Sequence, residues 1–236
     1  MGRHRGVLIV ALVVFLAATA LHLTAQLLAG QALRDWSQAL LMPPLALVMW
    51  AWYPPGRVRT GVLMALLLSW VGDVLPKVVP DDVSFLTMVG GFLVAQLVYV
   101  AVFLPWVAAA LRAPAGRRRL LLAAVVYLPL VIILSLFLVP HAAGLAWPVV
   151  IYAAVIGAMA ISAVAVHPVA AAGAALFVLS DAMIGLNAFW PPYQLPGQGF
   201  WVMVTYIGAQ VLLVLGIGRR LVIDSPSPAH TKSGTV

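Results

Sequence analysis

The sequence predicts an all-α, polytopic membrane bundle of eight transmembrane helices, and three observations lead to this prediction. Of the 236 residues, 64% are hydrophobic and 8% are charged, whereas a soluble globular domain has roughly 25% charged residues. The mean hydropathy is +1.11. Apolar runs of about 20 residues, long enough to cross a bilayer as a helix, recur along the chain. We therefore expect one multi-pass membrane domain over residues 1–223, in a bacterial plasma membrane.

The first expected span covers residues 7–29 and follows the basic residues Arg3 and Arg5. A cleaved signal peptide has the same basic start, but its apolar core is only about 7–15 residues long. This stretch is longer, and further spans follow it. We therefore interpret it as a retained first helix.

Joints rich in proline, glycine or charge divide the rest of the chain, because proline and glycine interrupt helices. In order, the joints are PPGRVR (54–59), VVPDD (78–82), RAPAGRRR (112–119) and WPPYQLPGQG (190–199). The apolar runs between and beside them are the expected spans 37–53, 60–77, 84–109, 119–138, 147–166, 168–189 and 199–221. The polar sequence DSPSPAHTKSGTV (224–236) is rich in proline and serine, and we expect a disordered cytoplasmic tail there.

The basic residues predict the orientation, since lysine and arginine accumulate in cytoplasmic loops. With the N-terminus inside and the spans alternating, the cytoplasmic segments hold Arg3, Arg5, Arg57, Arg59, Arg112, Arg117, Arg118, Arg119, Arg219 and Arg220. Near the membrane, the opposite side holds only Arg34 and Lys77. This bias predicts that both termini are cytoplasmic. It also accounts for the net charge of +7 without nucleic-acid binding.

Several kinds of site are excluded by composition and by the motifs that the sequence lacks. There is no cysteine, so neither a disulfide nor a thiolate nucleophile is possible. The sequence contains no P-loop, no H-E-x-x-H zinc motif and no G-x-S-x-G nucleophile elbow, and its five histidines are scattered. We expect neither a metal nor an organic cofactor.

Two aspartates interrupt apolar helices: Asp73 in LLLSWVGDVL and Asp181 in LFVLSDAMIG. A charged side chain at the centre of a membrane helix costs about 2.5–3.5 kcal/mol on insertion scales, and such residues usually face a polar interior and mark a functional path. Two alternatives stay open. Asp73 lies near a helix end, where it could reach water beside Lys77, and Asp181 could serve a structural role.

Other polar side chains recur at helical spacing in these spans. Residues three or four apart share a helix face, as do Ser69 with Asp73, Gln96 with Tyr99 and Tyr206 with Gln210. Gln38 lies in the expected span 37–53, and Ser180 lies beside Asp181 in the expected span 168–189. These faces predict a single polar pocket between helices that opens toward the non-cytoplasmic side. The alternative for the glutamines and serines is hydrogen bonding between helices without a catalytic role.

Two carboxyl groups in one sheltered pocket can provide one acid and one base. Glycosidases use such a pair for hydrolysis through an oxocarbenium ion. A vinyl ether hydrolyses by a similar route, in which protonation at carbon is followed by addition of water and collapse to an aldehyde and an alcohol. We expect Asp181, the deeper residue, to be the acid and Asp73 to be the base, although the roles are interchangeable at this stage.

Five segments resemble motifs of the YhhN-like lysoplasmalogenase family. SWVGD (69–73) is similar to its S-x-x-G-D element, FVLSD (177–181) to F-x-x-S-D and TYIGAQ (205–210) to T-Y-x-x-A-Q. GGFLVAQLVYVAVF (90–103) and LLMPPLALVM (40–49) resemble its fourth-helix and second-helix segments. The resemblance extends over about residues 35–216 with the motifs in matching order.

The family hydrolyses the vinyl ether bond of lysoplasmalogens to a fatty aldehyde and a glycerophospho head group. The resemblance implies that Asp73 and Asp181 are catalytic and that a lysophospholipid is the substrate. It implies pocket roles for Ser69, Tyr99, Ser180, Tyr206 and Gln210. Two residues depart from the pattern, and both remain candidates for substrate binding: Gln38 stands where the family has Lys, and Gln96 where it has His. Arg34 or Lys77 is a possible replacement for the missing phosphate contact.

Two other functions remain as alternatives. The departures at Gln38 and Gln96 favour a lipid-binding member of the same fold that has lost the reaction. Buried aspartates also serve as proton relays in transporters. The absence of an internal repeat and of an obviously broken helix pair counts against a transporter. The sequence does not give the oligomeric state.

Overall fold

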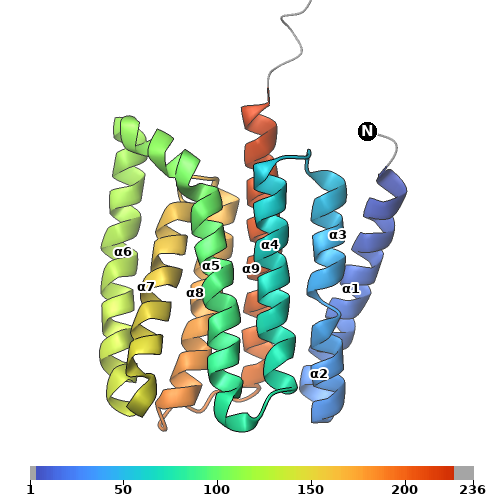
Figure 1. The fold of residues 1–236 in the computed structure, drawn as a ribbon, viewed down its shortest axis with the longest axis vertical. Coiled ribbons are helices and arrows are strands. Elements are labelled where there is room, and N and C mark those ends of the chain that lie inside the picture. Colours follow the sequence, from blue (N-terminus) through green and yellow to red (C-terminus); the bar gives the residue numbers. More distant parts are fainter. Residues whose placement is uncertain (1–3, 226–236) are drawn as a thin grey trace, which may run out of the picture.

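The computed structural model describes residues 4–225, and all regular secondary structure in that range is helical. The α-helices are α1 (Arg5–Leu28), α2 (Gln31–Ala39), α3 (Met42–Trp52), α4 (Arg57–Val74), α5 (Asp81–Arg112), α6 (Pro114–Leu138), α7 (Ala146–Ala163), α8 (Pro168–Phe189) and α9 (Gln198–Asp224). Short 3₁₀ helices cover Leu75–Lys77, Val139–His141 and Ala143–Leu145. The long helices stand side by side along one common direction (Figure 1).

Seven helical segments of the described chain are long and apolar enough to cross a membrane. They contain α1, α4, α5, α6, α7, α8 and α9. The short helices α2 and α3 together make one further passage along the bundle (Figure 1). The protein is therefore a multi-pass integral membrane protein with an all-α fold, as the sequence predicts. The helix α1 begins and α9 ends at the same end of the bundle. Which side of the membrane this end faces stays a prediction.

The second span differs from the prediction of one continuous helix over 37–53. It begins at Gln31 and is broken between Ala39 and Met42. Pro43 and Pro44 open α3, and proline lacks the N–H that a continuous helix would direct at the carbonyls of Ala39 and Leu40. The indole Nε1 of Trp70 on α4 donates to the freed carbonyl of Ala39 at 2.8 Å. This single break is not the pair of broken helices that is typical of transporters.

Two other helix boundaries differ from the prediction. The basic segment 112–119 is not a loop, because α6 begins at Pro114 directly after α5 ends at Arg112. Proline is well suited to the first position of a helix, since its fixed φ is already helical. At the C-terminus, Asp224 still belongs to α9, and residues 226–236 of the expected tail lie outside the described residues.

Small residues allow α4 and α5, and α8 and α9, to approach each other closely. A Cβ added to Gly91 on α5 would lie 2.7 Å from the Cα of Gly72 on α4. A Cβ added to Gly173 on α8 would lie 2.7 Å from the backbone nitrogen of Leu213 on α9. Backbones that lie this close bring the polar side chains next to them within hydrogen-bonding distance across the helix pairs.

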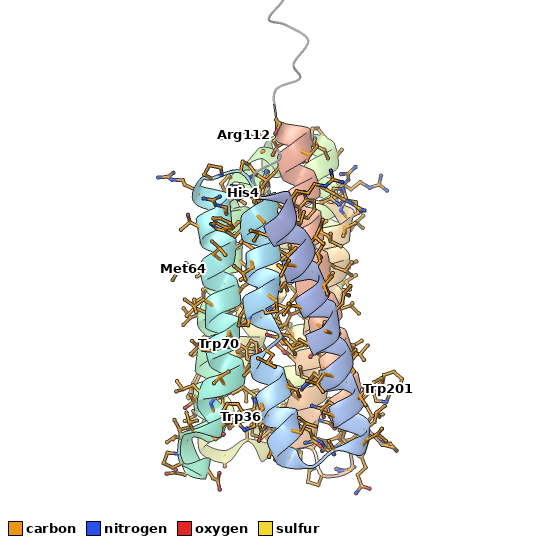
Figure 2. The ribbon with its side chains drawn as sticks, turned by 90° about the vertical axis from the view of Figure 1, so that its right-hand side faces the viewer. His4, Trp36, Met64, Trp70, Arg112 and Trp201 are labelled. Atoms are coloured by element: carbon orange, nitrogen blue, oxygen red, sulfur yellow. The ribbon has the colours of Figure 1, made fainter. Side chains whose placement is uncertain are left out.

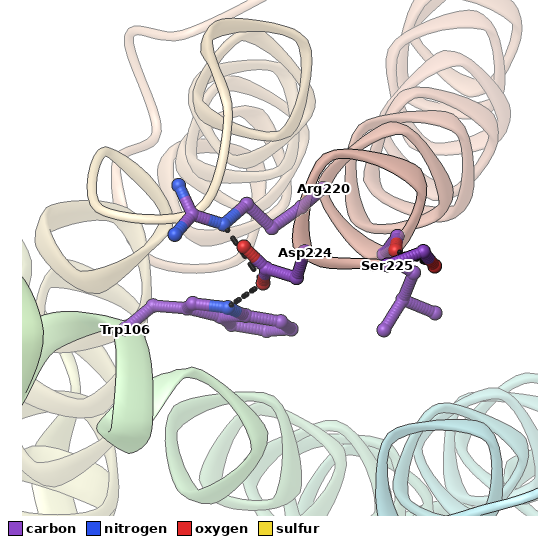
Figure 3. A network of polar contacts seen from close by, with 5 residues as sticks. Trp106, Arg220, Asp224 and Ser225 are labelled. Atoms are coloured by element: carbon purple, nitrogen blue, oxygen red, sulfur yellow. Dashed lines mark hydrogen bonds and ion pairs between the residues drawn. The ribbon is translucent and has the colours of Figure 1, made fainter. Parts of the chain in front are cut away.

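The outer surface carries exposed apolar side chains along the bundle, as a lipid-facing surface requires, and Met64 is one of them (Figure 2). His4 and Arg112 mark the end where α1 begins, while Trp36 lies toward the opposite end (Figure 2). At the first of these ends, α5 is joined to α9 (Figure 3). Trp106 Nε1 donates to Asp224 Oδ2 at 2.8 Å, and Arg220 Nε contacts the same oxygen at 3.1 Å.

Candidate functional site

A cavity of about 180 Å³ contains both aspartates in its wall. Asp73 comes from the last turn of α4, and Asp181 comes from α8. The remaining wall is built by α2, α5, α9 and the 3₁₀ helix Leu75–Lys77. The helix α2, the end of α4 and the start of α5 lie at the end of the bundle opposite the two chain ends (Figure 1). The structure thus brings together two carboxyl groups that are 108 positions apart in the sequence.

Asp73 is buried, with 4% of its surface exposed, and both of its carboxyl oxygens accept hydrogen bonds. Gln38 Nε2 on α2 donates to Oδ1 at 2.7 Å, and the Tyr206 hydroxyl on α9 donates to Oδ2 at 2.8 Å. Three helices therefore fix the orientation of this carboxyl.

Gln38 links Asp73 to the nearby cation Lys77. The ammonium of Lys77 donates to Gln38 Oε1 at 2.9 Å and also to the backbone carbonyl of Asp73. Since an ammonium has only donors, the amide oxygen of Gln38 must face Lys77, and its NH₂ group must face Asp73. Gln38 thus orients the carboxylate of Asp73 and the ammonium of Lys77 together.

Asp181 is half-buried and has one hydrogen-bond partner among the described residues. The Tyr152 hydroxyl on α7 donates to Asp181 Oδ2 at 2.5 Å, and no described group bonds to Oδ1. Tyr152 is not among the site residues predicted from the sequence. An isolated tyrosine on an apolar helix, with no polar residue three or four positions away, gives no pattern that points inward.

A second cavity, of about 80 Å³, adjoins the first at Asp181. Its wall comes from α5, α6, α7 and α8 and is apolar except for Asp181 and the Tyr152 hydroxyl. Met88, Phe92 and Ile184 line both cavities, as Asp181 does. The Asp181 carboxyl therefore faces the first cavity, called the polar cavity below, on one side and the second, apolar cavity on the other.

Three of the expected pocket residues form a buried network behind the polar cavity and do not line it. The Tyr99 hydroxyl donates to Gln210 Oε1 at 2.9 Å, and Gln210 Nε2 donates to Ser69 Oγ at 3.0 Å. Ser69 in turn donates to the carbonyl of Ala65 at 2.9 Å. The network joins α4, α5 and α9, and it fixes the helices that carry Asp73 and Tyr206.

The other two expected residues differ in position. Ser180 lines the polar cavity, but its hydroxyl donates to the backbone carbonyl of Val202 at 3.1 Å. Gln96 is fully buried, and its amide has no hydrogen-bond partner among the described residues. It is not in the wall of either cavity. Substrate contact by Gln96 therefore stays a prediction.

Of the two possible phosphate contacts, the structure places Lys77 in the cavity wall and Arg34 away from it. Arg34 Nε donates to the carbonyl of Ala29, the C-cap of α1, at 3.0 Å and to that of Ala25 in its last turn at 3.3 Å. His22 Nδ1 on α1 lies 2.8 Å from Ser37 Oγ on α2. These contacts attach α2 to α1 and so hold Gln38 in position.

No group of three or more His, Cys, Asp or Glu side chains within residues 4–225 has the arrangement of a metal site. The side chains that line the two cavities carry carboxyl, phenol, hydroxyl, amide and ammonium groups.

Comparison with known proteins assigns the chain to a family. The YhhN family matches residues 33–217, a range that includes Asp73 and Asp181. Proteins named lysoplasmalogenase from Mycobacterium bovis (strain ATCC BAA-935 / AF2122/97) and Mycobacterium tuberculosis (strain CDC 1551 / Oshkosh) are each 30% identical over 203 residues. The alignments cover 83% of this chain and 74% of each relative. No solved structure matches the chain. The family resemblance expected from the motifs is thus confirmed, and the protein belongs to the YhhN family.

Proposed function

We propose that the protein is a membrane hydrolase that cleaves the vinyl ether bond of a lysoplasmalogen into a fatty aldehyde and a glycerophospho head group. One observation carries the proposal: Asp73 and Asp181 line one polar cavity, and Asp181 also lines an apolar one. The names of the two mycobacterial relatives support the same reaction.

The two cavities fit the two halves of such a lipid. The head group occupies the polar cavity beside Gln38 and Lys77, and the start of the alkenyl chain enters the apolar cavity beside Tyr152. The vinyl ether joins these halves, so it lies at the boundary that Asp181 forms. Binding energy from the two remote halves then positions the reacting bond.

Asp181 is the proposed general acid. It has a carboxyl oxygen without a described partner, so a proton on that oxygen is free to reach the substrate. Asp181 gives this proton to the vinyl carbon farther from the ether oxygen, and the adjacent carbon becomes an oxocarbenium ion. The hydroxyl of Tyr152 holds the other oxygen of Asp181 and sets the direction of transfer.

Asp73 is the proposed general base. It takes a proton from water as the water adds to the oxocarbenium carbon, and a hemiacetal forms. Asp73 then returns this proton to the ether oxygen as the C–O bond breaks, while the hemiacetal hydroxyl gives its proton to Asp181. Both carboxyls recover their starting states, and the net reaction consumes one water.

The experiment uses the purified full-length protein in lipid nanodiscs, supplied with a lysoplasmalogen, and measures aldehyde release. We expect turnover by the wild type and losses of about 100-fold or more in Asp73→Asn and Asp181→Asn, since one general acid or base contributes roughly 10²–10⁴-fold. Asp224→Asn is the matched control and should retain activity, since Asp224 ends α9 at the end of the bundle opposite α2 (Figure 1). Full activity in either cavity variant would refute the roles assigned here.

Lipid binding without turnover is the second candidate. It is favoured by the departures at Gln38 and Gln96. The NH₂ group and the oxygen of the Gln38 amide are both already bonded to protein groups, and the Gln96 amide is unpaired among the described residues. The same assay separates it from hydrolysis, since saturable binding of lysoplasmalogen with no aldehyde would support it. A proton-coupled transporter would instead give flux that follows a pH gradient in sealed vesicles.

A further inference from the structure

We propose that Lys77 and Asp35 form a head-group subsite that selects lipids carrying both a phosphate and a cationic amine, with Lys77 binding the phosphate and Asp35 the amine. The inference rests on the proposed function, and it assigns the specificity of the polar cavity to two residues outside the acid–base pair. Both residues line that cavity.

Lys77 carries a charge that no described carboxylate neutralises by direct contact. Its two hydrogen-bond partners are the amide oxygen of Gln38 and the backbone carbonyl of Asp73, and both are neutral acceptors. An ammonium has three N–H donors, so one donor is left for a ligand. An anionic oxygen in the cavity would complete its coordination with a charge-assisted hydrogen bond.

Asp35 supplies the opposite charge from α2. Its Oδ1 accepts a hydrogen bond from Gln31 Nε2 at 2.9 Å, and Oδ2 has no partner among the described residues. The one ion pair in the described chain joins Arg220 to Asp224 in the last turns of α9, at the end of the bundle opposite α2 (Figure 1). Asp35 and Lys77 therefore face the same cavity without forming a pair with each other.

A zwitterionic head group complements this arrangement, because each of its charges meets the opposite charge of the protein. A head group that ends in phosphate alone satisfies Lys77 but adds a second negative charge beside Asp35. Repulsion from Asp35 therefore discriminates between head groups that all bind Lys77 through a phosphate. The subsite would therefore prefer phosphoethanolamine or phosphocholine head groups over a bare phosphate.

The position of Lys77 connects this recognition to the reaction. Lys77 follows Asp73 by four residues, and Gln38 bonds to both side chains. A phosphate bound at Lys77 is thus held at a fixed place relative to the Asp73 carboxylate. We expect head-group binding to fix the depth at which the vinyl ether lies.

The test compares four substrates with the same alkenyl chain: phosphocholine, phosphoethanolamine and phosphate head groups, and an alkenylglycerol without phosphate. In Lys77→Met, KM should rise about tenfold or more for the three phosphate-bearing substrates, as expected when a hydrogen bond to a charged group is lost, and stay unchanged for the alkenylglycerol. Lys77→Arg should restore most of the loss. In Asp35→Asn, the preference for zwitterionic heads over the bare phosphate should fall by about tenfold.

Asp82→Asn is the matched control for Asp35→Asn, since Asp82 is exposed, lies at the start of α5 and does not line the cavity. Equal rises in KM for all four substrates, or an unchanged head-group preference in Asp35→Asn, would overturn the subsite. Both results require turnover by the wild type. A wild-type protein that hydrolyses none of the four would count against the proposed function itself.

Discussion

The hydroxyl of Tyr152 donates a hydrogen bond of 2.5 Å to Oδ2 of Asp181, and it does so from α7 to α8. The Tyr206 hydroxyl makes the same kind of bond to Asp73, from α9 to α4, at 2.8 Å. Each aspartate is therefore oriented by a tyrosine of another helix. The pairs differ in one respect, because Asp73 has Gln38 as a second donor and Asp181 has none within the described chain.

Tyr152→Phe should lower kcat by about tenfold, because it removes one hydrogen bond to a catalytic carboxyl without shortening the ring that lines the apolar cavity. KM should change little, since the contact with the alkenyl chain is retained. Steady-state kinetics of aldehyde release would measure both. Tyr127→Phe, on α6 and outside both cavity walls, is the control for loss of a partly buried hydroxyl. A tenfold rise in KM at unchanged kcat would contradict the positioning role.

Trp70→Phe should lower the free energy of unfolding by about 1–2 kcal/mol, because the carbonyl of Ala39 at the break between α2 and α3 loses its hydrogen bond. Thermal unfolding in detergent would detect the change. Trp36→Phe is the control, since the Trp36 side chain is 76% exposed and no described residue bonds to it. Equal melting temperatures for Trp70→Phe and wild type would show that the indole bond does not stabilise the break.

Gly91→Ala should destabilise the protein by about 1–3 kcal/mol, because the new Cβ would lie 2.7 Å from the Cα of Gly72 and 2.8 Å from its nitrogen. Both contacts are with backbone, so α4 has to move, and Asp73 next to Gly72 moves with it. Activity should therefore fall as well. The neighbouring Gly90→Ala is a matched control with no atom within 4 Å of its Cβ. A normal melting temperature and normal activity in Gly91→Ala would contradict the close approach.

The membrane fold was predictable from sequence because long apolar runs leave few alternatives to helices in hydrocarbon. The break in the second span was not predicted, although Pro43 and Pro44 were visible. Whether two prolines bend, break or begin a helix depends on which neighbour satisfies the freed carbonyl. That neighbour is Trp70, thirty-one residues later in the chain.

The candidate site was predictable in part. The cost of a carboxyl in hydrocarbon singled out Asp73 and Asp181, and helical spacing added Ser69, Tyr206 and Gln210. Spacing could not separate the residues of the cavity wall from the network behind it, because residues on one face of a helix differ in depth only after packing. Tyr152 and Asp35 were missed for the same reason, since their importance comes from contacts with other helices and with the cavity.

The position of Asp181 in the walls of both cavities bears on how the fragments depart after cleavage. If the vinyl ether is cleaved beside Asp181, as we propose, the aldehyde would be formed in the apolar cavity and the glycerophospho fragment in the polar one. Neither fragment has to travel past the other. On this proposal the aldehyde would leave among α5 to α8 and the water-soluble product beside Lys77, so that cleavage itself would separate the two products.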